Sequence, residues 1–409
     1  MNNSAELVIN QILIMLALIL FGGVVFSKIS ELLHLPDVVL YIIFGLLIGP
    51  NVLNLIDVNQ FSIGNELILT IGAAYILYDG GREVNLKVLN KVKISVLMLA
   101  TVGVIISTFI TGFFTMKIFG MSFMTALLAG AIVASTDPSV LIPLFKKIKI
   151  KDKLKQTIIC ESAFNDAVGA ILTFTIITII LKNQFSALDT LIQLGKSTGV
   201  GLIVGLIFGL ISTLLVSEKP YGVLMEYPYM VSLATVCASY AVSTIFSGSG
   251  FMSVFIAGII FGNKEIIGIS HSEKHEIRHF HFKEVMTTIF RMMIFILLGT
   301  QIEFNIIIKY WLPALLVVLV LIFIARPISV LLCVTVDRKA KWNIREIIYL
   351  MWTRETGVIP AALSSMLVSM NIPNANIISS ITFMTIIITL TIQASTAKNL
   401  SKALKLDII

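Results

Sequence analysis

Long apolar stretches separated by short polar connections make up most of the sequence. A helix that crosses a lipid bilayer needs about 20 apolar residues, and most of the stretches approach or exceed that length. They lie at residues 7–27, 37–53, 64–81, 94–115, 122–144, 157–181, 194–216, 226–247, 250–262, 284–304, 308–336, 346–370 and 375–397. The pattern predicts an all-α polytopic membrane protein with about 13 transmembrane helices. Because some stretches are short or broken by Gly or Pro, counts of about 12 or 14 stay open.

Composition narrows the class of protein further. Hydrophobic residues make up 57% of the 409 residues and charged residues 13%, and the mean hydropathy is +0.97. A soluble domain carries about twice that charge, so a water-soluble enzyme is excluded. The spans leave no room for a soluble regulatory domain, and residues 1–409 are expected to form a single transmembrane domain. The sequence has no ATP-binding motif and no phosphate-loop glycine spacing, so we expect no cofactor.

The basic residues are distributed unevenly over the connections. Lys and Arg accumulate in cytoplasmic loops, and here most of the 30 basic residues fall in the connections after the odd-numbered spans and in the C-terminal tail. The other side of the membrane has only Lys117, Lys182, Lys196 and Lys309. This asymmetry predicts a multi-pass protein of the cell membrane with its N-terminus outside and its C-terminus in the cytoplasm. The net charge of +7 is then explained by topology, and no nucleic-acid partner is expected.

Ionisable side chains at membrane depth are costly and usually functional. Those inside the predicted spans are Asp79, Asp137, Glu161, Asp166, Arg291, Arg326, Arg354 and Glu355. Asp79 and Arg326 lie near the inner ends of their spans, so we expect them to reach water by snorkelling. The others are candidate functional residues.

Span 157–181 carries two of these acids. Asp166 lies about 14 Å from the inner end at 1.5 Å per residue, close to the bilayer midplane. Ser162 shares its helix face, whereas Glu161 points about 140° away. We therefore expect Asp166 to face an ion cavity with Ser162 as a neighbouring ligand. Arg291 lies at about the depth of Glu161, which predicts a Glu161–Arg291 pair; the alternative is that both acids pair with arginines to hold the helices together.

Two other spans contain predicted breaks. In Ser135-Thr136-Asp137-Pro138, Pro138 removes a backbone donor and disfavours helix before it, so the chain should unwind at Thr136-Asp137. Irregular backbone at that depth is tolerated where it lines a cavity, and Thr136 and Asp137 are expected to add oxygen ligands for an ion where the helix opens. The segment 353–360, with Gly357 and a second proline, is the counterpart. A simple kink is the alternative at both places.

The two breaks occupy opposed positions in the two halves of the chain, which is typical of an inverted-repeat secondary transporter with a midplane site. The predicted fold therefore has two inverted repeats with crossed unwound helices in spans 5 and 12. The first repeat covers about 7–181, a linker span about 194–216, and the second repeat about 226–397. Arg354 is expected to offset the carbonyl ends or the acids where the breaks cross.

These residues resemble the cation/proton antiporter superfamily, in particular its NhaP-type sodium/proton exchanger branch. The matching segments are Ser135-Thr136-Asp137-Pro138 with Leu141-Ile142-Pro143, Glu161-Ser162-Ala163-Phe164-Asn165-Asp166, Phe290-Arg291 leading to Leu298-Gly299, Ala325-Arg326-Pro327, and Gly357-Val358-Ile359-Pro360-Ala361-Ala362. The family usually has Arg immediately before the glycine of span 12. Here Thr356 stands at that position and Arg354 two residues earlier.

The resemblance implies that Asp166 binds both the proton and the transported Na⁺, with Thr136 and Ser162 as nearby ligands. It also implies that Asp137 braces the crossed segments, that Glu161 and Arg291 form a structural pair around Asn165, and that the protein is a homodimer.

The expected activity is exchange of a monovalent cation for a proton, not an enzymatic reaction. Asn165 cannot titrate and leaves Asp166 as the titrating acid, so one proton per cation, and no net charge movement, is predicted. Na⁺ is the first candidate and Li⁺ a second, with K⁺/H⁺ exchange as the main alternative. A cation channel or membrane sensor is a weaker alternative, because selectivity filters need rings of ligands from several subunits. An intramembrane hydrolase has no support, because every histidine lies in a loop.

His271, His275 and His279 repeat at four-residue intervals in one inner connection and could share a helix face. Histidine titrates in the physiological range, so one interpretation is a cytoplasmic pH sensor. A metal site and an ordinary solvated loop are the alternatives.

Overall fold

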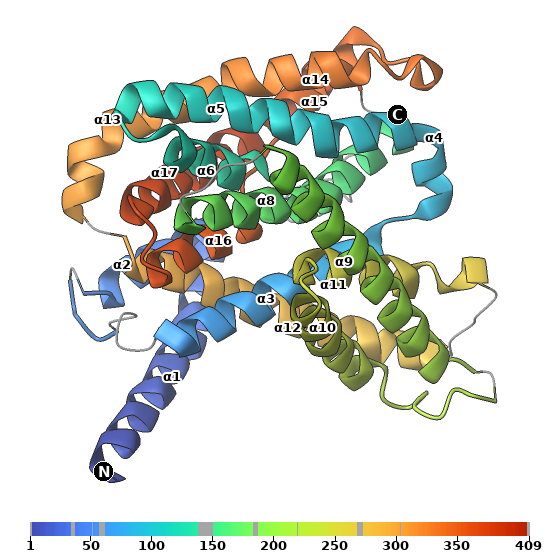
Figure 1. Ribbon diagram of the computed structural model, residues 1–409, viewed down its shortest axis with the longest axis horizontal. Coiled ribbons are helices and arrows are strands. Elements are labelled where there is room, and N and C mark those ends of the chain that lie inside the picture. Colours follow the sequence, from blue (N-terminus) through green and yellow to red (C-terminus); the bar gives the residue numbers. More distant parts are fainter. Residues whose placement is uncertain are drawn as a thin grey trace.

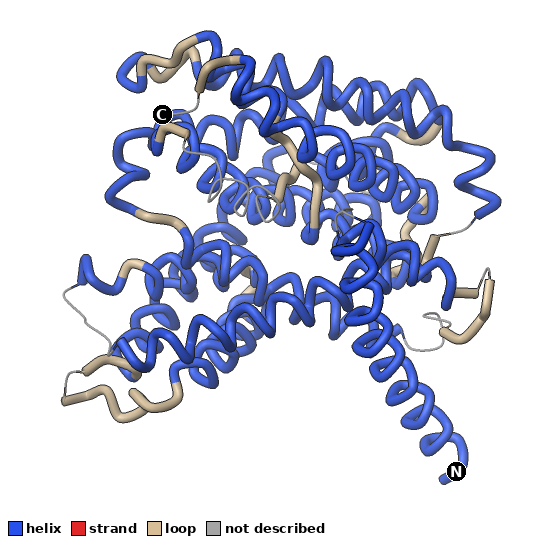
Figure 2. The backbone as a smooth tube through the Cα atoms, turned by 180° about the vertical axis from the view of Figure 1, so that it is seen from behind, coloured by secondary structure: helices blue, strands red, loops and turns tan. Residues whose placement is uncertain are grey.

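The structure is a computed structural model that describes residues 2–33, 37–50, 52–56, 62–137, 150–182, 187–218, 220–267, 273–302 and 304–406. Within these ranges the regular elements are helices (Figures 1 and 2). They are α1 (Asn2–Leu33), α2 (Asp37–Ile48), α3 (Ser62–Glu83), α4 (Leu86–Met98), η2 (Leu99–Gly103), α5 (Val104–Phe119), α6 (Phe123–Ala134), α8 (Asp152–Lys182), α9 (Ala187–Leu215), α10 (Pro228–Ile245), α11 (Gly250–Gly262), η3 (Lys264–Ile267), α12 (Glu273–Thr300), α13 (Phe304–Val320), η4 (Leu321–Ala325), α14 (Arg326–Val334), η5 (Arg338–Ala340), α15 (Ile344–Trp352), α16 (Val358–Ser369), α17 (Ala375–Ile388), η6 (Thr389–Ala394) and α18 (Ser395–Ala403).

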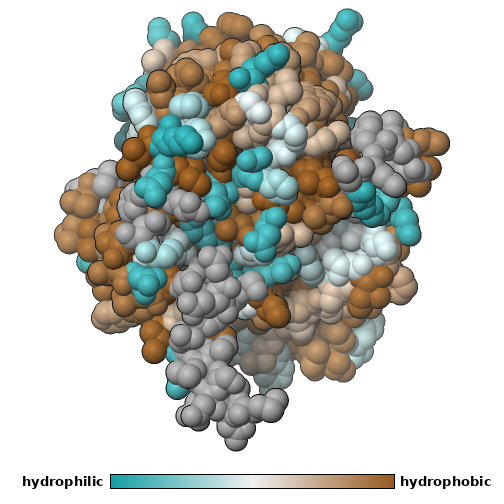
Figure 3. All heavy atoms as spheres, turned by 60° about the vertical axis from the view of Figure 1, so that its left-hand side comes forward, coloured by the Kyte–Doolittle hydropathy of each residue, from teal (hydrophilic) through white to brown (hydrophobic). Residues whose placement is uncertain are grey.

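The predicted all-α polytopic fold is confirmed. In the described residues, seven helical segments are long and apolar enough to cross a membrane, and α2, α6, α11 and α16 are shorter apolar helices. Within the described residues, each predicted span coincides with a helix or with helices joined by an interruption. Large apolar side chains such as Phe21 (77% exposed) and Phe323 (59% exposed) lie on the surface, and the face in Figure 3 is largely covered by hydrophobic residues. A soluble monomer rarely exposes apolar patches of this extent, whereas lipid contact requires them.

The helices form two groups, seen one above the other in Figure 1. We call α4, α5, α6, α8 and α13–α18, with their π-helical turns, the core bundle, and α1–α3 with α9–α12 the scaffold bundle. Each half of the chain contributes to both groups. Helix α9 lies in the linker span that was predicted between the repeats.

Three short helices, α6, α11 and α15, begin at side-chain caps. Ser122 accepts a hydrogen bond from Thr125 N (3.3 Å) at the start of α6, and Ser249 accepts one from Met252 N (3.1 Å) at the start of α11. At α15, Asn343 and Glu346 form a reciprocal capping box. Such caps satisfy the free N–H groups of a helix start and stabilise it by about 1 kcal/mol, which matters most for a helix of three or four turns.

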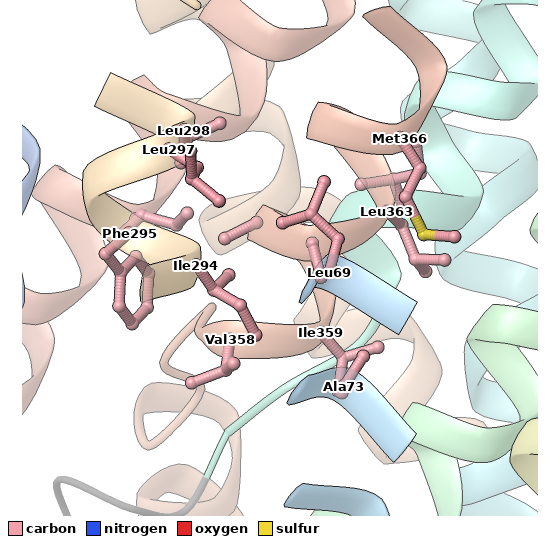
Figure 4. Packing of buried hydrophobic residues seen from close by; sticks show 14 of the residues in the cluster. Leu69, Ala73, Ile294, Phe295, Leu297, Leu298, Val358, Ile359, Leu363 and Met366 are labelled. Atoms are coloured by element: carbon pink, nitrogen blue, oxygen red, sulfur yellow. The ribbon is translucent and has the colours of Figure 1, made fainter. Parts of the chain in front are cut away.

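The two bundles meet along α16. Figure 4 shows apolar side chains of α16, such as Val358 and Ile359, beside Leu69 and Ala73 of α3 and Ile294 of α12. These side chains are at most 2% exposed. The second half of a broken span therefore lies at the boundary between the bundles.

Candidate functional site

Two interrupted spans cross inside the core bundle. Helix α6 ends at Ala134 and is followed by non-helical residues 135–137, while residues 353–357 are non-helical between α15 and α16. The backbone N–H of Asp137 donates to the carbonyl oxygen of Glu355 at 2.8 Å, which joins the two segments directly. Figure 2 shows loop segments among the helices of this bundle. The predicted crossing of unwound helices in spans 5 and 12 is confirmed.

Each broken span supplies a charge to a helix end of the other. The guanidinium of Arg354 donates through Nη2 to the carbonyl oxygen of Val133 at 2.6 Å, at the C-terminal end of α6. The backbone N–H of Val358 donates to Asp137 Oδ2 at 3.1 Å, at the N-terminal end of α16. A cation at a helix C-terminus and an anion at a helix N-terminus both interact favourably with the helix dipole. Arg354 thus offsets a carbonyl end, one of its two expected roles.

Gly357 is required by the close approach of the two segments. A Cβ atom at this position would lie 2.0 Å from Asp137 Oδ2 and 2.2 Å from Asp137 Cβ. No side chain fits there without moving the Asp137 carboxylate away from the start of α16. The next residue back, Thr356, donates its backbone N–H to Thr389 Oγ1 at 3.1 Å, in the π-helical turn η6.

Asp166 of α8 lies against the first unwound segment. Its side chain is buried, with 7% of the residue exposed, and Ser135 donates its hydroxyl to Asp166 Oδ1. Among the described residues, Asp166 belongs to no salt bridge. Sequence reasoning missed Ser135. The sequence could have pointed to Ser135 because it directly precedes Thr136. Where a helix unwinds, successive residues there can turn their oxygen atoms toward the same ligand.

Asn165 fixes the unwound segment onto α8. Thr136 N donates to Asn165 Oδ1 at 3.1 Å, and Asn165 Nδ2 donates to Thr136 Oγ1 at 2.8 Å. Ser162 donates its hydroxyl to the carbonyl oxygen of Thr136. An ionised aspartate at position 165 could only accept hydrogen bonds, so the amide is needed for this two-way contact. The structure thus brings the predicted residues Thr136, Ser162 and Asn165 together beside Asp166.

The predicted Glu161–Arg291 pair is wrong. Arg326 of α14 donates hydrogen bonds from both terminal nitrogens to the Glu161 carboxylate, and the Nη2–Oε2 distance is 3.0 Å. Arg291 lies in the scaffold bundle and binds Asp37 Oδ2 at 3.0 Å. The prediction rested on the equal depth of Glu161 and Arg291 along the membrane normal. Two residues at the same depth can belong to different bundles and then do not meet.

The expectation that Arg326 snorkels to water is wrong as well. Its side chain is 5% exposed, and besides Glu161 it binds the carbonyl oxygen of Leu350 through Nε (3.1 Å) and Nη2 (2.9 Å). It therefore ties α8 and α15 to α14. Asp79, assigned the same behaviour, is 8% exposed and pairs with Lys283 Nζ at 3.0 Å.

Glu355 is a further buried acid at the crossing, for which the sequence suggested no role. It is 1% exposed, and among the described residues its Oε1 atom has no hydrogen-bond partner. Its backbone carbonyl oxygen, as described above, accepts the Asp137 N–H.

Four predicted residues are not tested. Pro138 and His271 lie outside the described residues. His275 and His279 lie in the first turns of α12, but their side chains are not among those described. The interpretation of this histidine repeat as a pH sensor stays a prediction.

Comparisons with known proteins agree with this geometry. Residues 14–403 match the family model described as sodium/hydrogen exchanger, transmembrane. The probable Na⁺/H⁺ antiporter 2 of Methanocaldococcus jannaschii is 29% identical over 95% of this chain and 96% of its own length. The K⁺/H⁺ antiporter NhaP of Alkalimonas amylolytica is 27% identical over 98% of this chain and 68% of its own length. The structure of the sodium proton antiporter MjNhaP1 from M. jannaschii at pH 8 superposes with a TM-score of 0.85 over 95% of this chain and 97% of that one, at 27% identity.

Proposed function

Because the family match covers nearly the whole chain, the chain belongs to the sodium/hydrogen exchanger family, and we propose that it exchanges Na⁺ for protons across a cell membrane by alternating access. The observation that carries this proposal is the buried Asp166 carboxylate, which has no cationic side chain beside it among the described residues and lies against an unwound segment rich in oxygen atoms. Such a carboxylate is free to exchange ligands.

In the proposed site, Asp166 binds either a proton or Na⁺. The oxygens of Thr136 and Ser162 complete the coordination of the ion, as backbone and hydroxyl oxygens replace its hydration shell. Asp137 lies at the same crossing and acts chiefly by holding the start of α16. Burial favours the neutral form of a carboxyl group, so a proton competes with Na⁺ for the same oxygens.

Transport follows if only the loaded forms of Asp166 permit the core bundle to rock against the scaffold bundle. Glu161 with Arg326, and Asn165 with Thr136, support the site by keeping α8, α15 and the unwound segment in fixed relative positions. Substitution of these residues should therefore alter stability as well as transport.

A stoichiometry of one proton per cation is the finer part of the proposal. Asn165 carries no titratable proton, so a single carboxylate moves no net charge in either loaded form. A membrane potential, which supplies about 2.3 kcal/mol per charge per 100 mV, then has nothing to act on. Sodium-driven proton flux in proteoliposomes should be the same at zero potential and at a valinomycin–K⁺ potential, once K⁺ is shown not to be a substrate. If the flux depends strongly on the membrane potential, a second titrating group takes part in each cycle. Glu355 and Asp137 would be the first candidates to test.

K⁺/H⁺ exchange is the second candidate function, favoured by the similarity to the A. amylolytica K⁺/H⁺ antiporter. Proteoliposomes with an internal pH dye decide between the two when Na⁺, Li⁺ and K⁺ are added in turn. We expect Na⁺, and more weakly Li⁺, to drive proton movement. A response to K⁺ alone would replace the first proposal by the second.

We also propose the arrangement in the membrane. The charge asymmetry supports an N-terminus outside and a C-terminus in the cytoplasm, with repeats at about 7–181 and 226–397 joined by the linker span 194–216. The family resemblance supports a homodimer in the bilayer. Accessibility of single cysteines introduced at each terminus to a membrane-impermeant reagent tests the orientation, and light scattering of the purified protein tests the dimer.

A further inference from the structure

A cavity of about 510 Å³ lies away from the ion site, where the C-terminal part of α8 meets α9, α10 and the start of α11. From α8 it is lined by Ile171, Phe174, Thr175, Thr178 and Lys182. At 100° per residue these positions point about 80–180° away from Asp166 around the helix. The cavity is therefore separate from the proposed ion site.

The walls of this cavity have two kinds of surface. Part of the lining is aromatic, because Phe174 stacks on Phe251 with ring centroids 5.8 Å apart, and Tyr240 contacts Phe251 edge-on at 5.1 Å. Polar groups such as the amide of Gln193 and the hydroxyl of Ser197 also line the cavity. An occupant that fits both surfaces has an apolar part and a polar part.

Two lysines, Lys182 at the end of α8 and Lys196 of α9, line the same cavity. They are two of the four lysines that the charge asymmetry places on the outer side. The other two are accommodated elsewhere: Lys117 lies over the Phe113 ring at 5.8 Å and Lys309 over the Tyr310 ring at 5.0 Å. Lys182 and Lys196 are exposed at the cavity, and within the described part of the chain they form neither an ion pair nor a ring contact. Two unpaired ammonium groups at one cavity favour a ligand of negative charge.

We propose that this cavity binds an anionic phospholipid, with its phosphate between the ammonium groups of Lys182 and Lys196 and an acyl chain along the wall of Phe174 and Phe251. The shared chemistry of the ligand is a phosphate group. The lipid is favoured over free phosphate because the aromatic wall needs an apolar partner. An occupant contacts α8 of the core bundle and α9–α11 of the scaffold bundle at once, so it bears on the movement of one bundle against the other.

The direct test measures lipid binding and does not depend on transport. The melting temperature of the purified protein in detergent is followed while phosphatidylglycerol or phosphatidylcholine is added, and native mass spectrometry counts the retained lipids. We expect phosphatidylglycerol to stabilise the wild type. In the double variant Lys182→Gln/Lys196→Gln the apparent affinity should fall by about 30-fold, since each lysine near an anionic lipid contributes roughly a fivefold gain.

The matched control is Lys117→Gln/Lys309→Gln, which removes the other two outer lysines and should respond to phosphatidylglycerol like the wild type. An unchanged lipid response in Lys182→Gln/Lys196→Gln, or an equal loss in both double variants, would overturn the site.

A second variant tests the apolar half of the cavity. Thr178→Phe fills the space and leaves both lysines in place, so it should also lose the phosphatidylglycerol response, while Thr178→Ser should keep it. If inorganic phosphate alone stabilises the wild type as strongly as the lipid, and Thr178→Phe keeps that effect, the ligand is free phosphate and the lipid assignment is wrong. Should Thr178→Phe fail to fold, the lysine variants still decide.

Discussion

Arg326–Glu161 and Arg291–Asp37 are both arginine–carboxylate pairs, and they differ in their exposure to water. In the core bundle, the side chains of Arg326 and Glu161 are 5% and 3% exposed. In the scaffold bundle, those of Arg291 and Asp37 are 22% and 27% exposed. The core pair has lost its water almost completely and depends on its remaining protein partners, the Leu350 carbonyl oxygen among them. The scaffold pair is less completely enclosed by protein.

The difference indicates what each pair contributes. A buried pair costs much desolvation free energy, so it adds little net stability, but loss of one partner leaves an uncompensated charge. A partly exposed pair such as Arg291–Asp37 loses less solvation and is worth less either way. The core pair therefore specifies an arrangement of α8, α14 and α15 around the ion site, and the scaffold pair is a modest contact between α12 and α2. Asp166 belongs to neither class, because among the described residues it has no cationic partner.

The largest effect is expected for this unpaired carboxylate. Asp166→Asn should abolish sodium-driven proton flux in proteoliposomes, because an amide binds neither the proton nor the charge of Na⁺, while the protein should still fold and insert. Asp37→Asn, which removes a carboxylate from the scaffold pair, is the matched control and should retain most of the flux. Near-normal exchange by a folded Asp166→Asn protein would refute the mechanism.

Breaking the core pair comes next. Glu161→Gln or Arg326→Met alone should destabilise the protein by about 3–5 kcal/mol, whereas the double variant should lose clearly less than the sum. Thermal unfolding in detergent of the two single variants and the double variant measures the coupling. Additive losses would mean that the two side chains do not interact energetically.

Gly357→Ala tests the crossing that the core pair supports. Its Cβ atom would overlap the Asp137 carboxylate, and such overpacking typically costs about 1–3 kcal/mol, with a parallel loss of exchange because the start of α16 shifts. Gly64→Ala is the control, since nothing lies within 4 Å of a Cβ atom at Gly64. Equal melting temperatures and equal exchange rates for the two variants would show that the close approach has no energetic consequence.

The smallest effect is expected for the scaffold pair. Arg291→Met should change the free energy of unfolding by less than about 1 kcal/mol, and added salt should reduce the difference further. Unfolding at low and high ionic strength checks this. A loss comparable with that of Arg326→Met would remove the distinction between the two pairs.

The positions of the spans and of the two breaks were predictable from the sequence. Apolar length fixes where a helix crosses the membrane, and Pro138 and Gly357 marked the interruptions. The same reasoning found Asp166, Thr136, Ser162 and Asn165, because helix periodicity places them within one turn of each other or at the break.

Pairing between distant helices was not predictable in the same way. The rise per residue gives a depth in the membrane, and depth alone predicts Arg291 as the partner of Glu161 and Arg326 as a residue that reaches water. Which of them reaches Glu161 depends on how the helices are arranged around one another, and that is set by the packing of the whole bundle. Ser135 was missed because an unwound segment no longer follows the helical period, so the direction of its side chain could not be read from its spacing.

The reciprocal caps at the crossing have a consequence for biosynthesis. Arg354 and its acceptor Val133, and likewise Val358 and its acceptor Asp137, are 221 residues apart in the chain. At about 5–20 residues per second, the ribosome needs roughly 10–45 s to supply the second partner after the first. During that interval the end of α6 and the Asp137 carboxylate are inside or beside the membrane with no completed cap, so the first half of a nascent chain must be shielded by water, lipid headgroups or the insertion machinery until the second half arrives.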